Sequence, residues 1–362
     1  MKIGVLGDIL SYDGRGIARA TSFLFSNINR LFPDLELNLL SNKPLINKFA
    51  DNYLTISPAP NHVAKYALDY LICPWGHWHP SGIIAYKKSC PNTKLITFIH
   101  DIIPMLISDD GDRLSPSPTV ANINYKNFIQ AIIDNTDIIL VSSEYTKHDL
   151  IHHLDMKRKN IYTIPFSHML EKPTILGYNP YSFPFFLYNG GYDYRKGVSH
   201  ILDNFLQLKL REKIVANLVL TGTYHSLNQR TDFLINYGKN KGWVCETGYI
   251  SDEELANLFS NAVALLYPSL YEGFGLPPLE AMHLDCPVIT TRSSSIPEVC
   301  GDAAYYIDRE NEDEFQQVFI DLENNADLRN QLIVKGKENI KRFSWEKSAS
   351  KLVDILKQNL TK

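Results

Sequence analysis

Short apolar runs alternate with longer amphipathic stretches along most of this chain. In the first half, the runs that read as buried strands are Ile3–Leu6, Leu35–Leu40, Tyr70–Cys73, Leu95–Ile99, Ile138–Val141 and Ile161–Ile164. Stretches of helical length lie between several of them, at Gly16–Leu31, Pro118–Ile133 and Tyr145–His153. Strands that are apolar throughout are typical of parallel sheets covered on both faces, and their alternation with helices indicates βαβ units. We therefore predict the α/β fold class.

The alternation breaks once, at Leu170–Phe183, a segment that contains two prolines and a glycine. A second series of apolar runs follows at Phe185–Tyr188, Asn217–Leu220, Trp243–Gly248, Ala262–Tyr267, Pro287–Thr290 and Ala303–Ile307. A chain of 362 residues is long enough for two domains of about 150 residues each. We predict a Rossmann-like domain over residues 1–169, a linker over 170–183, a second Rossmann-like domain over 184–344 and a final amphipathic helix within 345–362.

Charge and cysteine usage exclude several classes of function. The formal net charge is −4, whereas proteins that bind nucleic acid usually carry a basic excess, so no nucleic-acid partner is predicted. Five scattered cysteines without a C-x-x-C pair predict neither disulfides nor a structural metal site, which fits a reducing cytoplasm. An anionic ligand must therefore be held by local donors rather than by the field of the whole chain.

A glycine-rich loop follows the predicted strand that ends at Tyr267. Gly273 and Gly275 allow close approach of a ligand, and two prolines next to them suit the first turn of a helix. The positive end of that helix suits a phosphate, whereas the carboxylates of Glu272 and Glu280 are better suited to sugar hydroxyls. On spacing alone, an ordinary loop with one solvated glutamate and one glutamate at a helix start is an equal alternative.

Two adjacent cations, Arg195 and Lys196, follow Gly190 and Gly191 at the end of the predicted strand Phe185–Tyr188. Cations at the start of a helix oppose its dipole, which makes sense if they face a bound diphosphate. For an isolated pair, a solvated surface position is the competing interpretation. In the first half, His100 follows a predicted strand and could hydrogen-bond a ligand, although a buried histidine oriented by Asp101 is the simpler alternative.

Two further local patterns are informative. Gly14 and Gly16 form a glycine turn after the first strand, but the full dinucleotide fingerprint G-x-G-x-x-G is absent. Ser251 followed by Glu254 fits a capping box, which predicts that a helix begins directly after the strand Trp243–Gly248. This strand end lies at the carboxyl edge of the second sheet, where open α/β sheets bind ligands.

Glu272 and Glu280, with GFGLPPL between them, resemble the E-x7-E signature of the retaining GT-B glycosyltransferases of family 4. The segments around Gly248–Leu255, Pro268–Tyr271 and Pro297–Val299 also follow the usual order of that family. The pattern His100-Asp-x-x-Pro, together with Arg195-Lys196, is similar to the mannosyltransferase-type branch that builds O-antigen and other surface polysaccharides.

This resemblance implies a GT-B fold in which two Rossmann-like domains face each other across a cleft and residues 345–362 cross back to the first, acceptor-side domain. The implied activity is retaining transfer of a hexose, with mannose from GDP-mannose as the first choice, to a growing surface polysaccharide or lipid-linked saccharide. Neither a metal nor another cofactor is expected. The expected location is the cytoplasm, with peripheral contact at the inner membrane surface.

The resemblance also implies residue roles. Glu272 would bind hydroxyls of the donor sugar, Arg195 and Lys196 would hold the diphosphate, and His100 would lie beneath the sugar. The implied donor-binding positions are Gly14, Gly16, Gly191, Tyr249, Ile250, Gly273, Phe274, Gly275, Leu276 and Glu280. Among these, Glu280 would bind the ribose, and Tyr249 and Ile250 would flank the base. Gly191 stands where many members of the family have arginine, so Arg195 would carry more of the phosphate charge.

Two other functions are compatible with these residues. A sugar-nucleotide epimerase of the same fold would turn over the donor without an acceptor. A non-catalytic nucleotide-sugar-binding subunit of a polysaccharide assembly complex would bind without turnover. Retention of both Glu272 and Glu280 together with Arg195 and Lys196 argues against the second, since a sensor has no need of the whole set.

Overall fold

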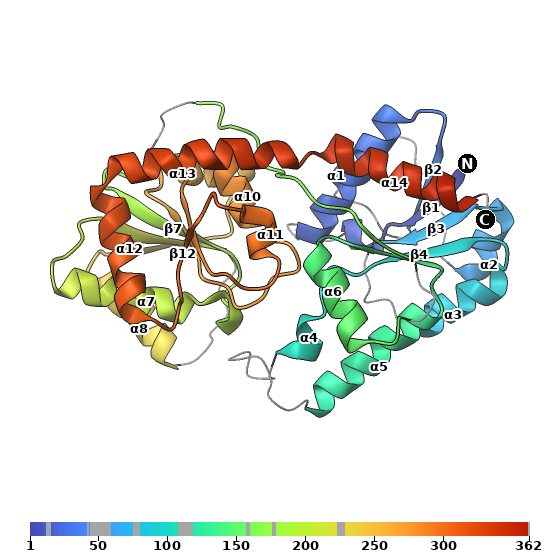
Figure 1. The fold of residues 1–362 in the computed structure, drawn as a ribbon, viewed down its shortest axis with the longest axis horizontal. Coiled ribbons are helices and arrows are strands. Elements are labelled where there is room, and N and C mark those ends of the chain that lie inside the picture. The colour runs from blue at the N-terminus through green and yellow to red at the C-terminus, as the bar shows by residue number, and fades with distance from the viewer. Residues whose placement is uncertain are drawn as a thin grey trace. The chain divides into compact units, whose positions relative to one another are not determined.

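Two six-stranded parallel sheets organise the chain (Figure 1). The computed structural model describes residues 1–11, 16–41, 43, 59–74, 80–107, 119–156, 160–175, 179–222 and 229–360. Chain contacts divide it into two units: residues 1–106, 115–169 and 343–362 form the first, and residues 107–114 and 170–342 form the second. The α/β class predicted from the alternation of apolar runs is confirmed.

The sheet of the first unit has the strand order β2-β1-β3-β4-β5-β6. Its strands are β1 (Lys2–Leu6), β2 (Glu36–Leu40), β3 (Tyr70–Cys73), β4 (Lys94–Phe98), β5 (Ile138–Val141) and β6 (Asn160–Thr163). The α-helices of this unit are α1 (Gly16–Leu31), α2 (Pro60–Val63), α3 (Pro80–Ser89), α4 (Ile103–Leu106), α5 (Val120–Asp134), α6 (Glu144–His153) and α14 (Trp345–Leu360). Every predicted strand of the first series is present, shifted by no more than one residue at its ends.

The sheet of the second unit has the order β12-β11-β10-β7-β8-β9. Its strands are β7 (Phe185–Asn189), β8 (Asn217–Thr221), β9 (Val244–Gly248), β10 (Leu265–Tyr267), β11 (Val288–Thr290) and β12 (Tyr305–Tyr306). Its α-helices are α7 (Val198–Leu210), α8 (Gln229–Asn240), α9 (Asp252–Asn261), α10 (Leu276–His283), α11 (Ile296–Cys300), α12 (Glu312–Asn324) and α13 (Ala326–Asn339).

Two of these strands, β10 and β12, are each three residues shorter than the sequence predicts. The predicted strand Ala262–Tyr267 begins only at Leu265, because Ala262 caps the end of α9 and donates back to Leu258 and Phe259. The predicted strand Ala303–Ile307 is reduced to β12 because the N–H of Ala303 turns back to the carbonyl of Cys300. In both cases a helix end uses residues whose apolar character alone suggested a strand.

Alternation along β7 builds the core of the second unit. Phe186 and Tyr188 point to one face of the sheet, where they join a buried cluster with side chains of α7 and α12. Phe319 of α12 meets Phe186 edge-on, with 4.8 Å between the ring centroids. Aromatic pairs in this geometry add to the stability that their burial provides. Strand β7 is thus fixed on both sides, by its neighbours β8 and β10 in the sheet and by helices over its face.

The predicted amphipathic helix that begins at Trp345 is confirmed as α14, and it packs against α1 in the first unit (Figure 1). Trp345 donates from Nε1 to the carbonyl of His168 at 2.9 Å, and the Tyr70 hydroxyl donates to the carbonyl of Leu356 at 2.7 Å. Both contacts join segments far apart in sequence. The first unit is therefore discontinuous, since its last helix follows the whole of the second unit in the chain.

One smaller prediction about a helix start can be compared with the structure. The capping box is confirmed: Ser251 Oγ accepts from the N–H of Glu254, and the Glu254 carboxylate accepts from the N–H of Ser251 at 2.9 Å, which starts α9. Within the described ranges, no helix combines the length and apolar character needed to cross a bilayer.

Each sheet has one place where neighbouring strands lead away in opposite directions. In the second sheet the chain runs from β7 to β8 and β9 on one side, then returns to β10 on the other side of β7. In the first sheet the same reversal occurs between β1 and β3. Loops after the two strands at such a switch point diverge and leave room for a ligand at the carboxyl edge. The loops after β7 and β10 hold the cationic pair and the glycine-rich segment predicted from the sequence.

Gly222, directly after β8, should be more sensitive to substitution than other glycines with a positive φ. A Cβ at Gly222 would lie 2.1 Å from the carbonyl oxygen of Gly190, whereas a Cβ at Gly242 would meet no atom within 4 Å. Both positions have a positive φ, so each alanine variant costs about 1–2 kcal/mol in backbone strain. We expect Gly222→Ala to lose about 1–3 kcal/mol more than Gly242→Ala in chemical unfolding. Equal losses of unfolding free energy in the two variants would contradict the close approach of the loops after β7 and β8, at Gly190 and Gly222.

Candidate functional site

A buried cluster of charges lies at the switch point of the second sheet. The loop after β7 ends in a single 3-10 turn, Tyr194–Lys196, which presents Arg195 and Lys196. The loop after β10 presents Glu272. Lys196 Nζ lies 2.6 Å from Glu272 Oε1, and Arg195 Nη1 lies 3.0 Å from the same oxygen. Their side chains are only 10–15% exposed, so both solvated interpretations of these residues are wrong.

Neutral hydroxyl groups complete the surroundings of this cluster. The hydroxyl of Ser269, which is fully buried, donates to Glu272 Oε1 at 2.6 Å. Lys196 Nζ donates to the Tyr267 hydroxyl at 3.1 Å and lies 5.1 Å from the centroid of that ring. Burial, followed by the nearby Glu272 charge, raises the pKa of Tyr267 far above its ordinary value. The phenol therefore stays neutral and accepts a hydrogen bond from the ammonium.

The cluster holds its carboxylate in the ionised form. Burial by itself raises the pKa of Glu272, but Lys196 and Arg195, with hydrogen bonds from Lys196 and Ser269, lower that pKa to about 2. The pKa of Lys196 is also lowered, because burial and the neighbouring Arg195 outweigh the attraction of Glu272. Two buried cations share one buried carboxylate, while Asp193, 3.4 Å from Arg195, is half exposed. The buried part of the cluster therefore has an excess of positive charge, which a bound anion would neutralise.

The two loops that carry the cluster are tied to each other through their backbones. The N–H of Leu270 donates to the carbonyl of Arg195 at 2.9 Å, and Arg195 Nη1 donates to the carbonyl of Tyr271 at 2.5 Å. Gly197, with φ +78°, starts α7 in the left-handed conformation, and a Cβ there would lie 2.8 Å from the carbonyl oxygen of Pro268. This position therefore requires glycine for both its dihedral angle and its close contact.

A third loop, after β11, holds the glycine-rich segment from the other side. The N–H of Glu272 donates to Ser294 Oγ at 2.8 Å, and Ser295 Oγ contacts the carbonyl oxygens of Glu272 and Phe274 at 2.8 and 2.7 Å. Ser294 has a φ of +51°, which is unusual for a residue other than glycine. Strain of this kind persists where the surrounding contacts fix the backbone.

The match with known proteins covers the part of the chain that contains this cluster. Residues 179–339 match the family described as Glycosyl transferases group 1. O-antigen chain mannosyltransferase B of Escherichia coli is 28% identical over 234 residues, which is 62% of this chain and 61% of that protein. MMP alpha-(1->4)-mannosyltransferase of Mycolicibacterium hassiacum is 31% identical over 171 residues, or 46% of this chain and 41% of that protein. The chain thus matches about three fifths or less of the length of these two relatives.

The fold comparison extends over the whole chain. Sucrose-phosphate synthase of Thermosynechococcus elongatus matches with a TM-score of 0.75 and 16% identity, covering 99% of both chains. Anabaena HepE, solved in complex with UDP and glucose, matches with a TM-score of 0.71 and 14% identity, covering 99% of this chain and all of that chain. Over residues 179–339 the chain is therefore similar to the group 1 glycosyltransferases. Its two parallel sheets confirm the predicted GT-B fold.

Other predicted donor-binding residues lie on the same sheet edge. Gly273, Phe274 and Gly275 are buried in the loop before α10, and Leu276 is the first residue of that helix. Glu280 lies on α10 with 5% of its surface exposed. Gly275 has φ +116°, and a Cβ at Gly191 or Gly275 would meet no atom within 4 Å. Tyr249 is 67% exposed after β9, beside half-buried Ile250.

The predicted residues of the first half belong to the other unit. His100 follows β4, and its Nε2 lies 2.7 Å from the carbonyl oxygen of Pro74, which follows β3 at that unit's switch point. Its ring stacks on Phe98 at 4.6 Å. Gly16 is the exposed first residue of α1, whereas Gly14 lies outside the described residues. The proposed contacts of His100, Gly14 and Gly16 with a donor stay predictions.

Sequence reasoning missed the residues that hold the cluster together. It treated the Arg195–Lys196 pair and Glu272 as separate sites for phosphate and sugar, whereas the structure joins them through direct ion pairs. It also gave no role to Ser269, Ser294 or Ser295. The one available signal was spacing, because Ser269 stands three residues before Glu272 in a loop with a turn-forming proline.

The low pKa of Glu272 predicts how stability changes in acid. A carboxylate whose pKa is lowered in the folded state stabilises the fold fully at pH values above its ordinary pKa of 4.5. That stabilisation is lost as the pH falls from 4.5 toward the folded-state pKa of about 2. We expect the difference in unfolding free energy between wild type and Glu272→Gln to narrow as the pH falls from 5 to 3. Over the whole interval between the ordinary and the folded-state pKa of Glu272, this difference changes by up to about 3 kcal/mol. Urea unfolding at stepped pH measures it.

A matched background assigns this effect to the ion pair. In Lys196→Met, Glu272 loses one of its two cationic partners and keeps Arg195, so adding Glu272→Gln should change the acid dependence less than it does in wild type. A gap that stays constant with pH in the wild-type background would show that Glu272 is not held by these cations.

Proposed function

We propose that this glycosyltransferase moves mannose, with retention of configuration, from GDP-mannose to a saccharide or lipid-linked saccharide of a surface polysaccharide. The buried Arg195–Lys196–Glu272 cluster at the switch point of the second sheet carries the proposal. The relatives named as mannosyltransferases, including one named for O-antigen chains, support the choice of sugar and acceptor class. We further propose that the enzyme works in the cytoplasm, with peripheral contact at the inner membrane surface.

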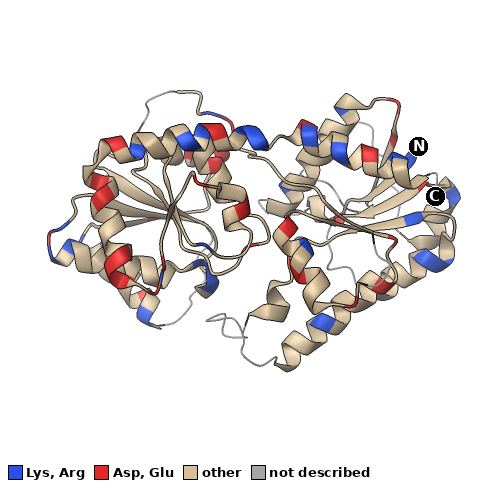
Figure 2. Ribbon diagram, in the orientation of Figure 1, with Lys and Arg blue, Asp and Glu red and all other residues tan. Residues whose placement is uncertain are grey.

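The positive charge needed for a diphosphate is local in this protein. Lys, Arg, Asp and Glu are interspersed over the ribbon in Figure 2, and the net charge is −4, so no global field favours an anion. Arg195 and Lys196 supply two cations against one buried carboxylate. A diphosphate placed beside them would complete the charge balance, and its oxygens suit both the guanidinium fork and the ammonium.

Glu272 serves this reaction as an acceptor for sugar hydroxyls. Lys196, Arg195 and Ser269 all donate to Oε1, so we assign the sugar contact to Oε2. The helix that follows contributes less than a usual helix start, because Pro277 and Pro278 have no N–H to donate. The backbone around Gly275, which is open to a close approach, becomes the more important contribution of this loop.

The proposed chemical step proceeds on one face of the sugar. The bond between the anomeric carbon and the donor phosphate oxygen breaks, and the nucleoside diphosphate takes the electron pair. The acceptor hydroxyl oxygen then bonds to the same carbon from the same face, and its proton passes to the departing phosphate oxygen. Arg195 and Lys196 stabilise the charge that develops on that oxygen, which is the type of stabilisation that lowers barriers most. We propose that these cations act without a metal or other cofactor.

Donor and acceptor panels test this function. Purified protein is incubated with GDP-mannose, UDP-glucose or dTDP-rhamnose, with and without saccharide and lipid-linked acceptors. We expect acceptor-dependent release of GDP, an α-linked product by NMR, and unchanged rates in EDTA. Turnover without any acceptor would indicate an epimerase, and tight binding without turnover would indicate a binding subunit. Either result would overturn the proposal, as would an inverted product.

Substitution of Lys196 tests the role of the cluster directly. Lys196→Met should lower kcat by at least about 100-fold, because a charge aimed at the departing phosphate acts mainly in the transition state. The matched control is Lys239→Met, which removes another Lys–Glu pair of the second unit, 2.8 Å long, between α8 and β9. Nucleoside diphosphate release measures both variants. Wild-type kcat in Lys196→Met would remove the lysine from the mechanism.

A further inference from the structure

Arg309, which follows β12, is hydrogen-bonded to both loops that carry the charge cluster. Its Nη1 donates to the carbonyl oxygens of Arg195 at 3.3 Å and of Pro268 at 3.4 Å. The first carbonyl belongs to the loop of the cationic pair, and the second belongs to the loop that leads to Glu272. Only 3% of Arg309 is exposed. The guanidinium is thus a buried charge that donates hydrogen bonds to the backbone of two site loops.

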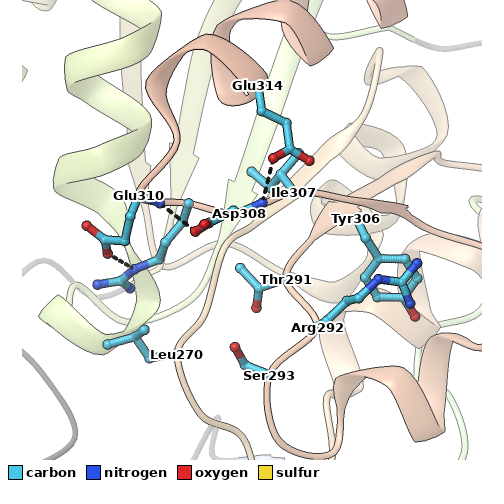
Figure 3. Close-up of a pocket in the computed structure, with 10 residues that line it drawn as sticks. Leu270, Thr291, Arg292, Ser293, Tyr306, Ile307, Asp308, Glu310 and Glu314 are labelled. Atoms are coloured by element: carbon cyan, nitrogen blue, oxygen red, sulfur yellow. Dashed lines mark hydrogen bonds and ion pairs between the residues drawn. The ribbon is translucent and has the colours of Figure 1, made fainter.

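A second set of contacts orients the Arg309 side chain. Its Nε lies 3.0 Å from Glu310 Oε1, and the same oxygen lies 3.4 Å from His200 Nε2 on α7. The guanidinium also lies 5.8 Å from the ring centroid of Tyr194, in the turn that presents the cationic pair. In Figure 3 the dashed line at the Glu310 carboxylate marks this ion pair. A planar fork fixed on one edge by a carboxylate presents its other edge in a defined direction.

We propose that Arg309 is a positioning residue for Arg195 and Lys196, an inference that rests on the proposed function. Because Arg309 is buried, it does not contact the nucleotide-sugar donor itself. It acts on the positions of Arg195 and Lys196 through the carbonyl groups of Arg195 and Pro268. The fold of the loop does not depend on it alone, because the carbonyl of Arg195 also accepts from the N–H of Leu270 at 2.9 Å. Loss of Arg309 should therefore shift the cations slightly rather than unfold the loop. Shifts of about 1 Å at a reacting centre can cost about 100-fold in rate.

A neighbouring pocket makes this role testable by chemical rescue. It has a volume of about 380 Å³, and its walls include Leu270, Arg309, Glu310 and Glu314 (Figure 3). Truncation of Arg309 to alanine would open a space next to this pocket, with Glu310 still present as a counter-ion. A guanidinium ion from solution can donate to the same two carbonyl oxygens and to the Glu310 carboxylate, and it can enter through the pocket.

Arg329 provides the matched control. Its Nη1 donates to two carbonyl groups in the same unit, those of Leu322 at 2.5 Å and Glu323 at 2.9 Å, at the junction of α12 and α13. Arg309→Ala and Arg329→Ala thus remove the same kind of grip, one at the site loops and one away from them.

The experiment compares kcat, donor KM and melting temperature for both variants. We expect Arg309→Ala to lower kcat by about 10- to 100-fold, with donor KM changed less than about threefold, and millimolar guanidinium to restore several-fold of the loss. Arg329→Ala should keep the wild-type kcat. Wild-type kcat in Arg309→Ala, an equal loss in Arg329→Ala, or no response to guanidinium beyond that of equimolar NaCl would overturn the inference.

Two further measurements keep the outcome decisive. If Arg309→Ala does not fold, Arg309→Lys keeps the charge but has a single nitrogen for the two carbonyls and Glu310 together, so a wild-type kcat in that variant overturns the inference. Amide hydrogen exchange at Gly197 and Leu270 should be faster in the Arg309 variant than in wild type, and unchanged exchange overturns it. If wild-type protein shows no transferase activity but the Arg309 variant still exchanges faster, the proposed function fails while the positioning contact of Arg309 holds.

Discussion

The ion pair between Lys196 and Glu272 is the contact on which the architecture of the site depends. It joins the loops after β7 and β10, the two strands that flank the switch point of the second sheet. Burying either charge alone would cost several kcal/mol, so each residue requires the other. The pair therefore fixes which two loops face each other and how closely they approach. Gly197 and Pro268 are in contact beside it because that approach leaves no room for a side chain.

A buried ion pair is weak support for stability, since well-packed apolar side chains often serve a fold as well. Its retention here is better explained by charge than by stability. Arg195 adds a second buried cation to the same carboxylate oxygen, and the pKa of Lys196 is lowered as a result of burial and of that neighbour. A cluster with an unmet positive charge is costly when empty and favourable when an anion arrives. Such a site suits an anion without any help from the net charge of the protein.

Periodicity and turn chemistry predicted most of the fold because they act locally. The apolar runs of β1, β3, β5, β7 and β8, the capping box at Ser251 and the helix from Trp345 all follow from residues close in sequence. The candidate site was predicted only in pieces, since the contact between Lys196 and Glu272 spans 76 residues and depends on strand order. Local pattern also failed where a helix end used apolar residues, at Ala262 and Ala303.

The residues that sequence reasoning could not assign share one property: their donors serve the backbone of the site loops. Thr291, Ser295 and Arg309 donate to carbonyl groups on these loops, and Ser294 accepts from the N–H of Glu272. Hydroxyl and guanidinium groups at such positions look like ordinary polar residues in a sequence, because their partners are main-chain atoms that every residue has. Their contribution is to hold charged side chains in place before a ligand binds, so that little reorganisation is needed when it does. A loop rich in glycine can then be rigid in this protein, because its order is imposed by neighbouring loops rather than by its own residues.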